Sequence, residues 1–122
     1  MVKNDCFDTD IAMKIDVLAL NGVFDTGLAA VLDAFATAND LSVAQGFAAT
    51  TFDVAVVGLR RQVRSNQGFK VPTLPAHRRP APDWVIVPAI GERSPEPLAS
   101  ALATPEARDA AEILRRWAEQ GA

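Results

Sequence analysis

Two short segments of the sequence carry the groups best suited to binding a small molecule. Asp25-Thr26-Gly27 stands where a helical pattern begins, and Pro88-Ala89-Ile90-Gly91 follows an apolar run. The first amides of a helix have no intrahelical acceptor and lie at the positive end of its dipole, so they can bind an anion or a carbonyl oxygen. We therefore predict a ligand site whose lining residues are Asp25, Thr26, Gly27, Pro88, Ala89, Ile90 and Gly91.

Both segments also have a purely structural interpretation. The side chain of Asp25 or Thr26 can cap the helix by accepting a hydrogen bond from an amide of the first turn. The segment 88–91 can be a plain connection between a strand and a helix, although ligands of open α/β sheets gather at the carboxyl ends of strands. The order of the strands decides between these alternatives.

A strand, a tight turn and a helix must position the first segment. The stretch 15–20 is apolar except for Asp16, as expected for a parallel strand that is covered on both faces. The turn Asn21-Gly22 follows, and the helix after it places four apolar side chains on one face, namely Leu28, Val31, Leu32 and Phe35. A second strand over 52–59 completes a β-α-β unit, whose right-handed crossover makes the two strands parallel.

The sequence from residue 62 to residue 87 predicts a hairpin, a connecting segment and a third strand. The hairpin has arms 62–64 and 69–71 and lies at a sheet edge, with Gly68 able to adopt the left-handed conformation of its turn. The proline-rich segment 72–82 is expected to be a surface connection with little regular structure. The run 84–87 is predicted to be a third buried strand.

Two helices are expected to follow. Ser94-Pro95 and Thr104-Pro105 each combine a capping side chain with proline at the first helical position. The longer, second helix is predicted to bury one face, made of Ala107, Ala111, Leu114 and Trp117.

Composition restricts the class of protein. With 122 residues and 49% hydrophobic residues, the chain can bury the core of one domain. A net charge of −3 argues against a surface that itself holds a nucleic-acid backbone. The sequence has one cysteine and no apolar run that could cross a membrane or serve as a signal peptide, so we expect a cytoplasmic protein. Residues 1–12 are predicted to be a flexible lead-in to one α/β domain over 13–122.

No other reactive side chain is predicted to belong to a catalytic or metal site. His77 is the only histidine and is expected to be a solvated loop residue, and Cys6 a bystander thiol. We predict no metal and no cofactor. Five arginines can form a basic edge that meets DNA or an acidic partner, or can simply protect an exposed hairpin from edge-to-edge pairing; they are Arg60, Arg61, Arg64, Arg78 and Arg79.

Several short patterns together resemble one family. These patterns are Val17-Leu-Ala-Leu-Asn-Gly-Val-Phe-Asp25, Asp33-Ala-Phe-Ala-Thr-Ala-Asn39, Phe52-Asp-Val54, Gly58-Leu-Arg60 and Pro82-Asp-Trp-Val-Ile-Val-Pro88. The chain resembles the amino-terminal half of AraC-type transcriptional regulators of the GlxA kind, whose sensor domain is similar to the DJ-one/PfpI branch of the class I glutamine amidotransferase-like fold. The resemblance implies a flavodoxin-like three-layer sandwich with a mainly parallel sheet, of which this sequence looks cut short after Ala122.

The resemblance also indicates which catalytic features are missing. Enzymes of the superfamily carry a cysteine on a nucleophile elbow after the point where this sequence ends. Their early acidic residue corresponds to Gly27, with Asp25 two positions earlier, and their oxyanion-binding Gly-Gly corresponds to Ala89-Ile90-Gly91. We therefore expect no catalysis by this chain.

Three functions follow from the sequence. The first is a sensing and dimerising domain of a transcription regulator, which binds an unidentified small effector and reaches DNA only through a domain absent from this chain. The second is the first half of a PfpI-type cysteine enzyme, such as an isonitrile hydratase or a glyoxalase-like hydrolase. The third is a stand-alone interaction domain that pairs through a sheet edge or its last helix.

Overall fold

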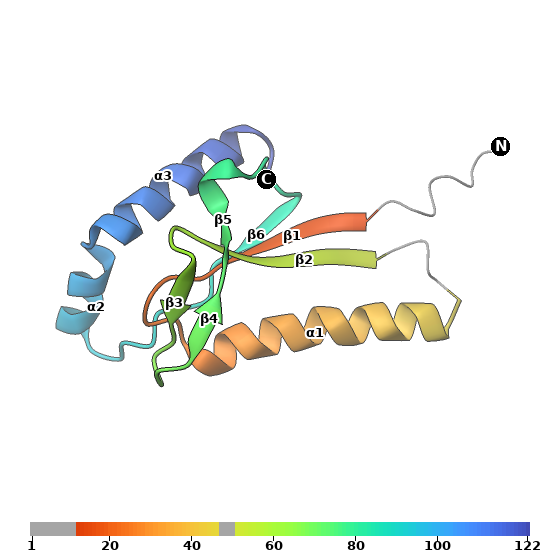
Figure 1. Ribbon diagram of the computed structural model, residues 1–122, viewed down its shortest axis with the longest axis horizontal. Coiled ribbons are helices and arrows are strands. Elements are labelled where there is room, and N and C mark those ends of the chain that lie inside the picture. Colours follow the sequence, from red (N-terminus) through yellow and green to blue (C-terminus); the bar gives the residue numbers. More distant parts are fainter. Residues whose placement is uncertain (1–11, 47–50) are drawn as a thin grey trace.

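A computed structural model describes residues 12–46 and 51–122, and Figure 1 shows the arrangement of its elements. Of the predicted lead-in, only Ala12 lies among the described residues, and Cys6 lies outside them. The elements are β1 (Ala12–Leu18), α1 (Asp25–Ala44), β2 (Thr51–Gly58), β3 (Gln62–Arg64), β4 (Lys70–Pro72), β5 (Leu74–Pro75), the 3-10 helix η2 (Ala76–Arg78), β6 (Trp84–Ile86), α2 (Pro95–Leu102) and α3 (Pro105–Glu119).

Four strands form one parallel sheet in the order β5-β2-β1-β6. The longest pairing joins β1 to β2, from Ala12 opposite Thr51 to Leu18 opposite Val57. The predicted β-α-β unit is confirmed, as is the α/β class. This topology is compatible with a flavodoxin-like fold, in which helices flank a parallel sheet.

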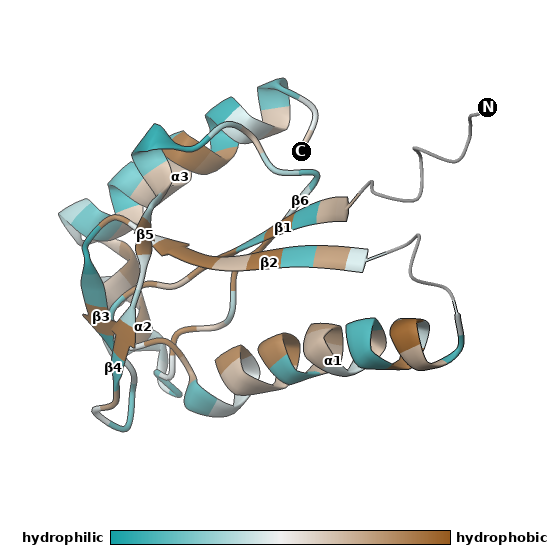
Figure 2. Ribbon diagram, turned by 45° about the vertical axis from the view of Figure 1, so that its right-hand side comes forward, coloured by the Kyte–Doolittle hydropathy of each residue, from teal (hydrophilic) through white to brown (hydrophobic). Residues whose placement is uncertain are grey.

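The sheet is covered on both faces, by α1 on one side and by α3 on the other (Figure 1). Because side chains alternate along a strand, β1 sends Ile15 and Val17 toward α1 and Asp16 and Leu18 toward α3. The predicted apolar face of α1 is confirmed, since its four residues pack on this first core. Figure 2 shows the same layering in the hydrophobic strands between the two helices.

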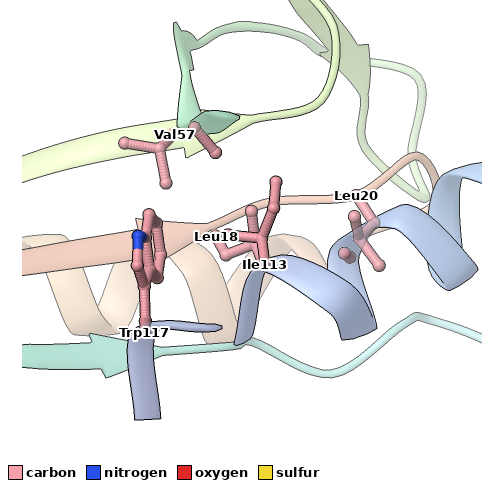
Figure 3. Close-up of a cluster of buried hydrophobic side chains, with 7 residues drawn as sticks. Leu18, Leu20, Val57, Ile113 and Trp117 are labelled. Atoms are coloured by element: carbon pink, nitrogen blue, oxygen red, sulfur yellow. The ribbon is translucent and has the colours of Figure 1, made fainter. Parts of the chain in front are cut away.

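The second core lies between the sheet and α3, where Trp117 is fully buried against Leu18 and Val57 (Figure 3). The helix buries Ala110 and Ile113 together with Trp117. The predicted face was therefore wrong by a small rotation, because Ala107, Ala111 and Leu114 are only partly buried. Turning Ile113 inward places a larger side chain than Ala111 against Leu18 and Leu20, and it also turns Glu106 inward.

The proline-rich segment contains more structure than predicted. Leu74 and Pro75 pair in parallel with Val57 and Gly58 as the edge strand β5, and Ala76 in η2 is fully buried. Proline lacks an amide donor and is tolerated on an edge strand. The prediction of an irregular connection was wrong because pairing with β2, a tertiary contact, organises it.

The predicted hairpin is present: its first arm is confirmed, its second arm begins one residue later than predicted, at Lys70, and Gly68 has a φ of 94°. Its predicted position was wrong, however, because β3 and β4 form a separate two-stranded sheet and β5 and β6 are the edges of the main one. The third predicted strand corresponds to β6, but its predicted burial was wrong: Trp84 is 61% exposed and Val85 and Ile86 are only partly buried.

A partly buried ion pair joins the central strand β1 to the residue that follows η2. The carboxylate of Asp16, on the central strand, accepts hydrogen bonds from Nε and the terminal Nη2 of Arg79 at 3.1 and 3.0 Å. The side chain of Asp16 is 2% exposed and that of Arg79 30%. These hydrogen bonds to Asp16, in particular, raise the pKa of the Arg79 guanidinium above its ordinary value. The pair anchors the segment after η2 to the centre of the sheet.

Removal of the arginine alone should be costly. We expect Arg79→Met to lower the free energy of unfolding by about 3 kcal/mol, because it leaves the buried Asp16 carboxylate without its counterion. Replacing both residues, as Asp16→Leu with Arg79→Met, should recover most of that loss. Chemical denaturation measures both effects, with the exposed Arg78→Met as a control that should change stability by less than about 0.5 kcal/mol. Equal losses at positions 78 and 79 would refute this assignment.

Candidate functional site

The predicted segment 88–91 meets the loop after β1, but through residues 22–24 and not through the other predicted segment, 25–27. The amide of Phe24 donates to the carbonyl of Ala89 at 2.8 Å, and the amide of Gly91 donates to the carbonyl of Gly22 at 2.7 Å. Between these bonds, Val23 and Ile90 form an antiparallel bridge. Backbone hydrogen bonds therefore join the loop after β1 to the loop after β6, and these amides and carbonyls are already paired with each other.

Asp25 has a different role from the predicted one. The residue that caps α1 is Phe24, and no side chain caps this helix end, so the prediction of a cap by Asp25 or Thr26 was wrong. The carboxylate of Asp25 instead accepts hydrogen bonds from the hydroxyl of Ser65 and, at 3.0 Å, from the amide of Gln67. It uses both oxygens to hold the hairpin turn against the start of α1.

The remaining predicted residues contribute little polar chemistry. Thr26 and Ala89 are exposed, whereas Gly27 and Pro88 are partly buried. A Cβ atom at Gly27 would lie in ordinary contact with Phe24, at 3.4 Å. Ile90 is the one member of the predicted set that lines the cavity described next.

A cavity of about 140 Å³ lies beside this junction, where β1 and β2 end and α3 begins. Its wall is partly apolar and partly charged, and the lining residues are Leu20, Asn21, Arg60, Ile90, Ala101, Thr104 and Glu106. In parallel α/β sheets the carboxyl ends of strands are the usual place for a ligand.

Glu106 is the unusual member of this wall. The residue is 8% exposed, and its Oε1 accepts a hydrogen bond from the amide of Asn21 at 3.2 Å. Oε2 accepts no hydrogen bond from the part of the chain that the structure describes. Its nearest cation is Arg60, whose Nε lies 3.9 Å away on a side chain that is 61% exposed. A buried oxygen without a hydrogen-bond partner is costly. Oε2 is itself shielded from solvent, so the nearby charge of Arg60 is its main compensation among the described residues.

The first turn of α3 holds this carboxylate in place. Thr104 caps the helix by accepting from the amide of Ala107 at 3.2 Å, which confirms the prediction for this helix, whereas the side chain of Ser94 makes no such bond in α2. Glu106 follows Pro105 in the first turn, where the helix dipole favours a negative charge. Asn21 links the same point to the hairpin, because its Oδ1 accepts from the amide of Arg64 at 3.0 Å.

Sequence reasoning missed Glu106, Asn21 and the position of Arg60. An acidic residue is common in the first turn of an exposed helix, so neither the type of Glu106 nor its place after Thr104-Pro105 indicated that it is buried. Only the rotation of α3 that buries Ile113 also buries Glu106. The sequence pattern that could have indicated this burial is the alternative helix face through positions 106, 110, 113 and 117.

A second, basic cavity of about 360 Å³ adjoins the first and shares Arg60 with it. Arg61, His77 and Arg78 also line it. Part of the predicted basic edge thus exists, but Arg79 pairs with Asp16 and Arg64 donates to the carbonyl of Gly68 at 3.2 Å. His77 is exposed, as predicted, although it belongs to the short helix η2.

Comparison of the chain with models of protein families, with curated proteins and with solved structures found no match. Among residues 12–46 and 51–122, no three or more histidine, cysteine, aspartate or glutamate side chains gather where they could hold a metal ion. No helix in these same two ranges is long and apolar enough to span a bilayer.

The junction beside the cavity should tolerate no side chain at Gly91. An added Cβ atom there would collide with Cγ of Asn66 and lie 2.6 Å from its Cβ. We expect Gly91→Ala to lower the free energy of unfolding by about 1–3 kcal/mol, as in other overpacked sites. The matched control Gly27→Ala has room and lies in a helix, so it should be neutral or stabilising by up to about 1 kcal/mol. Chemical denaturation of both variants provides the test, and a neutral Gly91→Ala would contradict the close packing of Gly91 against Asn66 of the hairpin turn.

Proposed function

We propose that this chain is the first part of a small-molecule sensing domain of an AraC-type transcriptional regulator of the GlxA kind, with a class I glutamine amidotransferase-like fold. The observation that carries the sensing role is the cavity at the ends of β1 and β2, which is lined by apolar side chains together with Arg60 and the buried Glu106. The sequence patterns shared with that family support the regulatory role. We propose a cytoplasmic location for the same reason, and DNA contact through a separate domain.

The walls of the cavity suggest how binding would be transmitted. They come from the loop after β1, the residues after β2, the loop after β6 and the two last helices. A ligand in contact with all of these segments would favour the arrangement in which they lie closest together. Such a molecule shifts the population of states only by the difference between its affinities for them.

The geometry supports binding more than catalysis. The resemblance places Gly91 where the enzymes offer an amide to an oxyanion, but here that amide donates to Gly22. The position of the enzymes' acid is Gly27, and the neighbouring Asp25 carboxylate is occupied by the hairpin turn. We therefore propose a sensor rather than a PfpI-type cysteine enzyme.

A thermal-shift screen with small metabolites tests the sensing role. A ligand that binds only the folded protein stabilises it by about 2.7 kcal/mol at a hundred times its Kd, so an effector should raise Tm in a concentration-dependent way. The variant Ala101→Leu should fill part of the cavity and abolish the shift while leaving the far-UV circular dichroism unchanged. Absence of any shift across the screen, or an equal shift in Ala101→Leu, would reject a sensor site in this cavity.

We further propose that two copies of the chain associate through the β6 edge. Beside this edge, Met13, Ile15, Phe35, Phe52, Trp84 and Ile86 line an apolar groove of about 280 Å³. Trp84 is 61% exposed and Met13 is 39% exposed. Among the residues that the structure describes, β6 is an edge strand next to exposed apolar side chains. This supports pairing with a second copy, which would cover both.

Sedimentation equilibrium of the purified chain tests this association. The wild-type chain should be a dimer, and Trp84→Glu should make it a monomer because a carboxylate in the interface would be desolvated. The control Leu102→Glu changes a similarly exposed apolar residue on α2, 55% exposed, and should remain a dimer. A monomeric wild type, or dissociation of both variants, would remove the β6 edge as the interface.

A further inference from the structure

Basic side chains gather at the carboxyl ends of two neighbouring parallel strands. Arg60 and Arg61 follow β2, whereas His77 and Arg78 follow β5, which pairs with β2 in parallel. All four line one cavity of about 360 Å³. Ligands of open α/β sheets bind just beyond the carboxyl ends of the strands, so the topology brings this basic cluster to a place that is suited to a ligand.

The backbone that carries these side chains is held in place on both sides of the cavity. The carbonyls of residues 60–61 accept hydrogen bonds from the hydroxyl and the amide of Thr73. Residues 77–78 follow Ala76, which is fully buried, and precede Arg79, which forms the ion pair with the central strand. Because the backbone is anchored, a ligand would have to order little more than the side chains themselves.

The cavity concentrates positive charge in a chain whose net charge is −3. Three arginines line it, and no acidic residue of the described part of the chain does. Arg60 lies 3.9 Å from the carboxylate of Glu106, whereas Arg61 and Arg78 form no ion pair with residues 12–46 or 51–122. Guanidinium groups that face one space repel one another, so an anion among them would be stabilised by all three.

A phosphate monoester suits this cavity better than a carboxylate or a free phosphate ion does. Its phosphoryl group carries a charge of about −1.5 to −2 and three acceptor oxygens, so it can bind several arginines at once. The planar fork of a guanidinium also matches two phosphate oxygens. A free phosphate ion would fill only part of 360 Å³, and Leu59 and Pro75 add an apolar wall on which an organic group can pack.

We propose that this cavity binds small phosphate monoesters, with the phosphoryl group between Arg61 and Arg78 and the organic group on Leu59 and Pro75. The site goes beyond the proposed sensing role, which rests on the neighbouring cavity beside Glu106. Apart from one shared arginine, the two cavities are lined by different residues.

Four probes test the ligand class on the whole chain, namely n-propyl phosphate, inorganic phosphate, succinate and dimethyl phosphate. Binding is measured by isothermal titration and by chemical-shift changes of the Arg61 and Arg78 amides in ¹H–¹⁵N spectra. Low ionic strength is used because salt screens exposed charges. We expect n-propyl phosphate to bind at least about fivefold more tightly than each other probe, because it alone joins a dianionic phosphoryl group to an alkyl chain.

Two variants remove one charge from each of the two strand ends. Arg61→Met and Arg78→Met should each lower the affinity for n-propyl phosphate about three- to tenfold, less than at a buried site because both side chains are exposed. The matched control Arg115→Met removes the same charge from an exposed position on α3 outside this cavity. It should change the affinity by less than about twofold. Circular dichroism of the free variants establishes that each one is folded.

Several outcomes would overturn the proposal. Equal losses in Arg115→Met and Arg78→Met would show attraction by the overall charge and no specific site. Equally tight binding of inorganic phosphate or succinate would refute the ester class, and equally tight binding of dimethyl phosphate would indicate a phosphodiester backbone instead. Absence of n-propyl phosphate binding to the wild type would reject the site.

One further variant separates this site from the proposed sensing cavity. Ala101→Leu fills part of the cavity beside Glu106, whose wall includes Ala101. Loss of n-propyl phosphate binding in Ala101→Leu, with unchanged binding in Arg78→Met, would assign the ligand to the sensing cavity and overturn this proposal. Loss in Arg78→Met alone would support it, whatever the metabolite screen shows for the sensing role.

Discussion

From Ile15 to Val17 the central strand β1 is paired on both edges and buried on both faces, so a polar group there needs a partner inside the protein. The rest of the structure is arranged around this requirement. The carboxylate of Asp16 accepts from Arg79, the carbonyl of Gly22 accepts from the amide of Gly91, and the amide of Asn21 donates to Glu106. Segments far apart in the sequence are thereby fixed at one strand.

These partners connect elements that the sheet alone would not hold. Arg79 ties the segment after η2 to the sheet, and Gly91 ties the loop after β6 to the loop after β1. At the other end of the same sheet, Asn39 near the end of α1 donates to and accepts from the backbone of Phe52, both at 2.8 Å. Side-chain and loop contacts thus complement the strand ladder at both ends of the β-α-β unit.

The candidate site lies where this requirement for partners inside the protein is only partly satisfied. Glu106 accepts from the amide of Asn21 with one oxygen, and its other oxygen is buried without a hydrogen-bond partner among the described residues. In the two segments that looked most available to a ligand, the carboxylate of Asp25 binds the hairpin turn, and Ala89 and Gly91 bind the backbone of residues 22 and 24. Whether a polar group is already occupied depends on packing rather than on residue type.

The sequence by itself determined the elements that depend on local pattern. The buried strand, the turn, the apolar face of α1, the arms of the hairpin and the Thr104 cap follow from hydrophobic period, glycine conformation and capping chemistry, which act over a few residues. The tertiary structure alone decided the edge strand β5, the rotation of α3, the partner of Asp16 and the burial of Glu106. Each of these results from contacts between residues distant in sequence, whose energy does not appear in any local pattern.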